Sequence, residues 1–357
     1  MTDDGLRLVD HRPRQAMRRP EHPVVRPRYP VIDAHNHLGP VFGGEWSARA
    51  VTELLAEMDA AGVEAMVDLD GGSGEALSVA IARWQALHPD RFVVFAGLDP
   101  DSWAGDEHFG ETEATRLRDS VARGAGGLKV WKTVGLGARD PQGRLVLPDD
   151  ERLDPIWAAA AELGVPVLIH VADPVAFFEP LDATNERWEE LQGHSDWHFW
   201  PPMSEADPGG FPAFDSLIDG LDTVLGRHPG TTFIGAHVGC AAEDLDRVSA
   251  MLDAHPNYHV DIAARIGELG RQPYTAREFF LRWADRIVFG TDTPGDPDTN
   301  RIYYRFLETR DESFQYDTGE TPGQGRWRIF GLGLPDDVLR KVYADNARRL
   351  LGLGERS

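Results

Sequence analysis

Cysteine is nearly absent from this chain of 357 residues, which contains only Cys240. A single cysteine excludes an intrachain disulfide and fits a reducing compartment, so we expect a cytoplasmic protein. The sequence also lacks any apolar run of about 18 residues, the length that a membrane-spanning helix requires. The first residues contain no short apolar segment of the kind that secretory signal peptides carry. These absences argue against a secreted or membrane-spanning protein.

Positive charge is also scarce. The chain has 36 Lys and Arg against 59 Asp and Glu, which gives a formal net charge of −23. Such an acidic surface disfavours nucleic acid and anionic membranes as partners and favours a small molecule. Residues 1–30 are the exception, because they are rich in Arg and Pro and show no hydrophobic period. We expect them to form an extended arm on the acidic body, with a nucleic-acid-binding tail as the alternative.

Short apolar runs alternate with helical patterns through residues 31–357, which we expect to form a single domain. Eight runs rich in Val, Ile, Leu and Phe are typical of parallel strands buried on both faces. They span residues 31–37, 65–70, 92–99, 127–132, 166–171, 231–238, 258–262 and 287–291. Ser47 is expected to cap a first helix that runs through Val51 and Met58. Further helices are expected over residues 75–87, 114–122, 153–163, 213–227, 242–254, 275–284 and 336–351.

Eight strands alternating with eight helices predict a (β/α)₈ TIM barrel. A doubly wound sheet is the alternative, but it would favour a Gly-x-Gly-x-x-Gly turn after an early strand, and the sequence has none. Two connections, over residues 174–227 and 294–335, are too long for a plain barrel. These loops follow the fifth and eighth strands, so we expect them to form lids or walls at the carboxyl end of the barrel.

Two histidines separated by one residue end the first expected strand. Because side chains alternate between the faces of a strand, His35 and His37 point to the same side. Two imidazoles on one face can serve as a pair of metal ligands. A His-x-His pair also occurs by chance at structural positions, so its meaning depends on the ends of the other strands.

Other strands end in side chains that bind metals or protons. They are Lys129 after the fourth strand, His170 after the fifth, His237 after the sixth and Asp292 after the eighth. In a barrel these ends converge on one mouth, so four histidines and a carboxylate together predict a metal site. Imidazole and carboxylate ligands suit Zn²⁺ best, with Mn²⁺ or Fe²⁺ as alternatives. The strand-ending carboxylates Asp70, Asp99 and Asp261 could rim this site, although we favour turn or capping roles for them.

With these residues in place, the sequence resembles the amidohydrolase superfamily, and in particular the branch that includes aminocarboxymuconate semialdehyde decarboxylase. The resemblance runs from residue 31 to the end and includes the closing stretch YADNARRLL at residues 343–351. It implies a divalent metal held by four side chains, namely His35, His37, His170 and Asp292. It also implies a homo-oligomer.

The resemblance implies further roles for three of these residues. Asp292 would handle a proton in addition to binding the metal. His237 would act as a base or polarising group in a mononuclear site, or as a ligand of a second metal in a binuclear site. Lys129 would bridge two metals if it were carboxylated, whereas many mononuclear relatives keep a plain lysine in a similar strand.

Residues near the expected mouth are candidates for substrate binding. We expect contacts from Trp131, beside Lys129, and from Arg187 and Trp188, in the aromatic connection after the fifth strand. A guanidinium matches a carboxylate with two hydrogen bonds, so Arg187 is the first candidate for clamping an acidic substrate. The alternatives for that role are Arg265, Arg301 and Arg305.

The expected function is hydrolysis of an amide, lactone or ester bond in a small polar or carboxylated molecule, through a metal-activated water. A non-oxidative decarboxylase of an aromatic or muconate-type acid is the alternative, because both reactions would use the same mouth. A metal-free binding protein that kept the barrel is less favoured, since every expected type of ligand is present.

Overall fold

The structure is a computed structural model that describes residues 5–7, 10–11, 13–14, 16–39, 45–204, 209–320 and 322–354. Its strands pair in parallel and follow one another in chain order, in sheets β1-β2-β3 and β4-β5-β6-β7-β8-β9. They are β1 (Val31–Asn36), β2 (Val63–Asp68), β3 (Phe92–Val94), β4 (Ala96–Gly97), β5 (Leu128–Val130), β6 (Val167–Ile169), β7 (Phe233–Gly235), β8 (Tyr258–Asp261) and β9 (Ile287–Val288).

The two sheets join into one closed barrel. Only Phe95 separates β3 from β4, so the expected third strand is present as two consecutive pieces. At the other junction, the Ala34 N–H donates to the Phe289 carbonyl, and the Asp292 N–H donates to the His35 carbonyl, both at 2.9 Å. These bonds connect β1 with the segment that follows β9. The predicted (β/α)₈ barrel is confirmed, and all of its strands except β2 are shorter than the sequence indicated.

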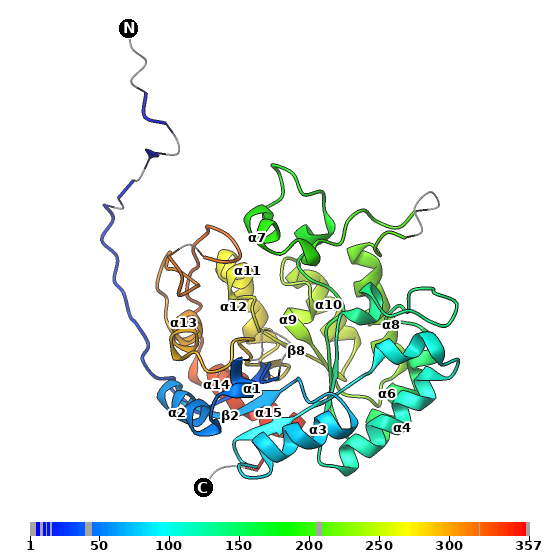
Figure 1. Ribbon diagram of the computed structural model, residues 1–357. Helices are drawn as coiled ribbons and strands as arrows, with labels where there is room; N and C mark the ends of the chain where they lie inside the picture. Colours follow the sequence, from blue (N-terminus) through cyan, green and yellow to red (C-terminus); the bar gives the residue numbers. More distant parts are fainter. Residues whose placement is uncertain are drawn as a thin grey trace.

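Helices surround the barrel in the expected order (Figure 1). Those between strands are α2 (Val51–Ala61), α3 (Gly74–Ala80), α4 (Phe109–Ala122), α6 (Asp154–Leu163), α8 (Phe214–Arg227), α10 (Leu245–Ala254) and α12 (Pro273–Arg282). The chain closes with α14 (Asp336–Arg340), the π-helical turn Lys341–Asp345 and α15 (Asn346–Leu351). Ser47 does not cap α2, because it lies inside the short helix α1 (Glu45–Ala48) and Ala50 takes the capping position without a side-chain hydrogen bond.

Apolar side chains cover both faces of the strands, as parallel strands under helices require. On β6, Val167 and Ile169 belong to the large cluster between strands and helices. Leu168, which points the other way, belongs to a smaller cluster that also contains Ile234 and Val288. None of the helices in the described part of the chain is both long and apolar enough to cross a membrane.

The long connections lie at the carboxyl end of the barrel strands. The first contains α7 (Trp188–Gly193) and two short 3₁₀ turns, and the second contains α13 (Pro297–Glu308). The segment before β1 contacts the body through a 2.7 Å ion pair between Arg28 and Asp336. Two further residues of this segment contact the body, because His22 binds Asp311 and Arg19 donates a hydrogen bond to the carbonyl of Ser313. The first described residues extend away from the barrel (Figure 1).

Candidate metal centre

The two histidines at the end of β1, His35 within the strand and His37 just after it, are each held by a carboxylate on one ring nitrogen. His35 Nδ1 lies 2.7 Å from Asp261 Oδ2, and His37 Nδ1 lies 2.7 Å from Asp70 Oδ1. A carboxylate accepts the proton of Nδ1–H and so leaves the lone pair of each Nε2 for a metal. Asp70 and Asp261, for which the sequence favoured turn or capping roles, therefore fix the tautomers of the two histidines.

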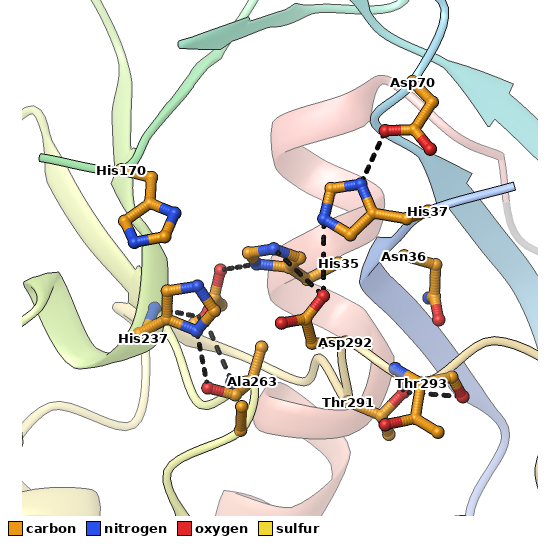
Figure 2. Close-up of polar contacts among 12 residues, drawn as sticks. His35, Asn36, His37, Asp70, His170, His237, Ala263, Thr291, Asp292 and Thr293 are labelled. Carbon is orange, nitrogen blue, oxygen red and sulfur yellow. Dashed lines mark hydrogen bonds and ion pairs between the residues drawn. The ribbon is translucent and has the colours of Figure 1, made fainter. Parts of the chain in front are cut away.

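Asp292 faces both of these Nε2 atoms (Figure 2). Its Oδ1 lies 3.8 Å from His35 Nε2 and 3.3 Å from His37 Nε2. The residue has a φ of 63°, a left-handed conformation that turns its side chain back towards β1. Asp33 fixes the neighbouring residue, since its carboxylate accepts hydrogen bonds from the backbone N–H and the hydroxyl of Thr291. The ligand atoms of His35, His37 and Asp292 all lie within 4.8 Å of one another.

The protonation states fit a cation at this position. Burial lowers the pKa of His35 well below its usual value, and the neighbouring Lys129 lowers it further. Neutral imidazole is the form that binds metals. His35 Nε2 and Asp292 Oδ1 are buried without a hydrogen bond from any described residue. Because a buried polar atom without a partner is costly, these two atoms fit a metal ion held between them.

His170 and His237 stand beside this group. The ring centroid of His237 lies 4.7 Å from that of His35 and 4.5 Å from that of His170. The carbonyl of Ala263 lies 2.8 Å from His237 Nδ1, so His237 keeps an unprotonated Nε2 (Figure 2). Burial lowers the pKa of His170 to about 4. Its Nε2 lies 3.3 Å from Asp173 Oδ1, and His170 is outside the group whose ligand atoms lie within 4.8 Å.

Lys129 is fully buried at the same mouth. Its Nζ lies 4.9 Å from the centroid of the Trp131 ring and has no hydrogen-bond partner among the described residues. Burial lowers the pKa of Lys129 to about 8, although Asp292 and Asp261 oppose the shift. An amine with this pKa is partly neutral at ordinary pH, and the neutral form is the one that can be carboxylated. A bridging role for Lys129 stays a prediction.

A cavity of about 340 Å³ opens over these residues. His37, His170, His237 and Asp292 line it together with three aromatic side chains, Trp131, Phe177 and Trp197. A mostly apolar hollow with a few convergent polar groups is the usual form of a small-molecule site. The strand ends that the sequence singled out therefore meet at one cavity.

Comparison with known proteins agrees with this geometry. The family model described as Amidohydrolase matches residues 32–353. The chain belongs to the amidohydrolase family. It is accordingly an enzyme. A search of curated proteins found no match.

Solved structures share the fold of this amidohydrolase. An uncharacterised TIM-barrel protein from Bordetella bronchiseptica has a TM-score of 0.56 at 15% identity, covering 91% of this chain and 99% of its own. The 2,6-dihydroxybenzoate decarboxylase from Rhizobium has a TM-score of 0.54 at 19% sequence identity, and the match covers the same shares of the two chains. A dihydroxybenzoic acid decarboxylase from Polaromonas sp. JS666, with bound manganese and 2-nitroresorcinol, has a TM-score of 0.56 at 17% sequence identity. The match covers 92% of this chain and 98% of the decarboxylase. At these identities the likeness shows the barrel fold alone.

Arg265, and not Arg187, brings a guanidinium to the cavity of this amidohydrolase. Arg265 lines the cavity but is only 5% exposed, and its Nη1 donates to the carbonyl of Ala264. It forms no ion pair with any residue that the structure describes. The other cation of the cavity, Lys132, is paired with Asp173. Arg265 is therefore the group best placed to receive an anionic substrate.

The predicted contacts of Arg187 and Trp188 with the substrate do not fit the structure. Arg187 is fully buried and pairs with Glu190, at 2.7 Å, and with Glu268. Trp188 is 44% exposed on α7, and neither residue lines the cavity. The sequence held a signal for this, because Glu190 follows Arg187 by three residues, the spacing of a local ion pair at a helix start. Of the three predicted contacts, only Trp131 reaches the cavity.

Proposed function

We propose that the chain is a metal-dependent decarboxylase that removes CO₂, without oxidation, from a planar aromatic or conjugated acid. The observation that carries this proposal is the guanidinium of Arg265, which forms no ion pair with a described residue and lies in an aromatic-walled cavity above His35, His37 and Asp292. Trp131, Phe177 and Trp197 offer flat faces to a planar ring. Two of the similar solved structures are decarboxylases of dihydroxybenzoic acids, which supports the same substrate class.

The residues of the site have separate roles in this reaction. A divalent metal, held by His35, His37 and Asp292 with His170 nearby, would supply positive charge that polarises substrate oxygens. Arg265 binds and orients the acid through charge-assisted hydrogen bonds. His237 presents Nε2 as an acceptor for a hydroxyl of the substrate, because Ala263 holds its Nδ1 proton.

Decarboxylation also needs a proton. Asp292 faces the cavity beside His237, where its carboxylate can accept a proton from a hydroxyl of the substrate or from water. Asp292 gives this proton to the ring carbon that bears the carboxylate. The bond between that carbon and the carboxylate then breaks, its electron pair returns to the π system of the ring and restores aromaticity, and CO₂ leaves. Rebinding of a proton restores Asp292 for the next turnover.

Hydrolysis of an amide, lactone or ester is the second candidate, and the buried Lys129 favours it. With a pKa of about 8, Lys129 is open to carboxylation, which would create a bridge for a second metal. His237 would then be a ligand of that metal. The number of metals per chain therefore bears on the choice between the two reactions.

The identity of the metal, the assembly and the location of the enzyme belong to the same proposal. Two imidazoles and a carboxylate suit Zn²⁺, whereas Mn²⁺ is the ion bound in the Polaromonas structure. We propose one of these two ions. A homo-oligomer in the cytoplasm, with residues 1–30 as an arm, remains the prediction made from the sequence.

Carbon dioxide release tests the proposed reaction. The enzyme, loaded with Mn²⁺ or Zn²⁺, is incubated with ¹³C-carboxyl-labelled mono- and dihydroxybenzoates, and labelled CO₂ is measured by mass spectrometry. We expect labelled CO₂ that disappears with a chelator and in Asp292→Asn. Parallel assays follow acid release from aromatic lactones and esters. Acid release without CO₂ from any of the benzoates would contradict decarboxylation and select the hydrolase.

A further inference from the structure

Asp261, the last residue of β8, contacts two histidines of the site at once. It is fully buried, and its Oδ2 lies 2.7 Å from His35 Nδ1. Its Oδ1 accepts hydrogen bonds from the backbone N–H groups of His237, at 2.7 Å, and Ala263, at 3.0 Å. The two oxygens of one carboxylate thus hold a side chain of β1 and the backbone that follows β7.

The backbone around His237 needs such support. Residues 237–240, which we call the His237 turn, are all left-handed, with φ values of 58°, 59°, 64° and 64°. Three of the four, His237, Val238 and Cys240, are not glycine, and residues with a Cβ rarely adopt this conformation. Strained backbone of this kind persists only where the surroundings enforce it, and it concentrates at functional sites.

The enforcing contacts come from β8 and the residues just after it. The Ala263 carbonyl holds His237 Nδ1 at 2.8 Å, and Asp261 holds the N–H of the same residue. The hydroxyl of Tyr258 packs so closely on the turn that a Cβ at Gly235 or Gly239 would lie 2.2 Å from it. Strand β8 therefore fixes the direction of the His237 ring, and Asp261 is its one charged contact with the turn.

We propose that Asp261 is a positioning residue that couples the metal ligand His35 to the His237 turn. Through Oδ2 it sets the tautomer of His35, and through Oδ1 it holds the strained backbone that aims His237 into the cavity. The part that concerns His35 rests on the metal site proposed above, whereas the part that concerns the turn does not.

Asp70 provides a matched control. Its Oδ1 contacts His37 Nδ1 at the same distance of 2.7 Å, and its Oδ2 accepts a hydrogen bond from the Gly39 N–H at 3.0 Å. Each aspartate therefore supports a different histidine of the His-x-His pair, Asp261 supporting His35 and Asp70 supporting His37. Asp261 alone of the two also holds the His237 turn.

Three variants separate the two contacts of Asp261, that of Oδ2 with His35 (the His35 arm) and that of Oδ1 with the His237 turn (the turn arm). In Asp261→Asn and Asp70→Asn, the new amide NH₂ cannot accept the Nδ1 proton, so the histidine moves its proton to Nε2 and loses its lone pair for the metal. The amide oxygen of Asp261→Asn can still accept the N–H groups of the turn. Asp261→Ala removes both arms.

Two measurements read the arms independently of turnover. Titration calorimetry of Mn²⁺ into chelator-stripped protein reports the His35 arm, and hydrogen exchange of the segment around residues 237–240, followed by mass spectrometry, reports the turn. We expect both Asn variants to bind Mn²⁺ about 10- to 100-fold more weakly than the wild type. We expect Asp261→Ala to show the same loss together with exchange at the turn that is about tenfold faster or more.

The outcomes that overturn the proposal are distinct. Wild-type exchange at the turn in Asp261→Ala, or equally fast exchange in Asp70→Asn, would remove the coupling role. Wild-type Mn²⁺ affinity in Asp261→Asn would remove the His35 arm, and because the coupling needs both arms, this result overturns the proposal even if Asp261→Ala does not fold. Absence of Mn²⁺ binding by the wild type would instead overturn the proposed function, while hydrogen exchange would still test the turn.

Discussion

The carboxyl end of the barrel and its interior contain buried histidines in opposite circumstances. At the carboxyl end, His35, His37 and His237 each have Nδ1 bound to an oxygen acceptor, at 2.7, 2.7 and 2.8 Å. In the interior, His259 of β8 is 4% exposed, and neither of its ring nitrogens has a hydrogen bond from a described residue. Its strand register places it beside the apolar Ile234.

The difference distinguishes histidines whose rings are oriented by a hydrogen-bond acceptor from a histidine that is only packed in the core. A fixed Nδ1 leaves Nε2 with a defined direction and a free lone pair, which a metal or a substrate hydroxyl can use. No side chain of a described residue fixes the direction of the His259 ring, and burial lowers its pKa to about 4, opposed by backbone groups of Phe233 and Asn257 and by no carboxylate. Burial and a lowered pKa therefore do not mark a functional histidine unless a second group orients the ring.

The largest effect is expected at the carboxyl end. Asp292→Asn keeps the shape of the side chain but removes its negative charge and its exchangeable proton, so we expect turnover to fall at least about 10³-fold. The free energy of unfolding should change by only about 1 kcal/mol, because no described residue hydrogen-bonds Oδ1. Steady-state rates and urea unfolding measure both quantities. Near-native turnover would show that the site is elsewhere.

The two buried arginines sharpen the comparison within the carboxyl end. Arg187→Met would leave Glu190 and Glu268 without their cation, so we expect a loss of about 3–5 kcal/mol in the free energy of unfolding. Arg265→Met breaks no ion pair among described residues and should instead raise KM about 10- to 100-fold. Urea unfolding and kcat/KM of both variants measure these effects. A raised KM in Arg187→Met with an unchanged KM in Arg265→Met would reverse our assignment.

The smallest effect concerns His259 and appears as a pH dependence. The unfolded chain binds a proton at this residue near pH 6.5, and the folded chain only near pH 4. The unfolded state therefore binds more protons between these values, so stability falls as the pH drops through them. We expect this residue to contribute about 2–3 kcal/mol of that fall between pH 7.5 and pH 4.5.

His259→Leu removes the titrating group and tests that contribution. The free energy of unfolding, measured in urea at pH 7.5 and 4.5, should fall less in the variant than in the wild type by about 2–3 kcal/mol. Because other buried groups titrate in both proteins, the comparison uses the difference between them. Equal falls in the two proteins would show that His259 is not the acid-sensitive group.

Much of the fold could be predicted from the sequence because buried parallel strands leave a strong local pattern. The runs at residues 127–132 and 258–262 contain β5 and β8, and Pro and Gly mark the junctions. The run at 92–99 did not reveal that Phe95 separates two strands, since that break depends on pairing with β2 and β5. Ser47 misled for a similar reason, because a local capping signal does not show where a neighbouring short helix begins.

The residues of the site could be predicted to the extent that they end strands. His35, His37 and Asp292 follow this rule and meet at the mouth. The partners that orient them did not stand out, because Asp70 and Asp261 are ordinary aspartates until the barrel brings each within 2.7 Å of an imidazole. The placement of Arg187 at the cavity was wrong, because its ion pair with Glu268 spans a long sequence distance that the sequence does not reveal, and the neighbouring Glu190 gave only a local signal.

Metal content is the most direct test of the proposed centre. We would measure it by elemental mass spectrometry on protein purified without chelator and again after reconstitution with Zn²⁺ or Mn²⁺. The grouping of His35, His37 and Asp292 predicts about one metal per chain, lost in His37→Ala. Two metals per chain would contradict a single centre and indicate a carboxylated Lys129, whereas no metal after reconstitution would contradict the metal site itself.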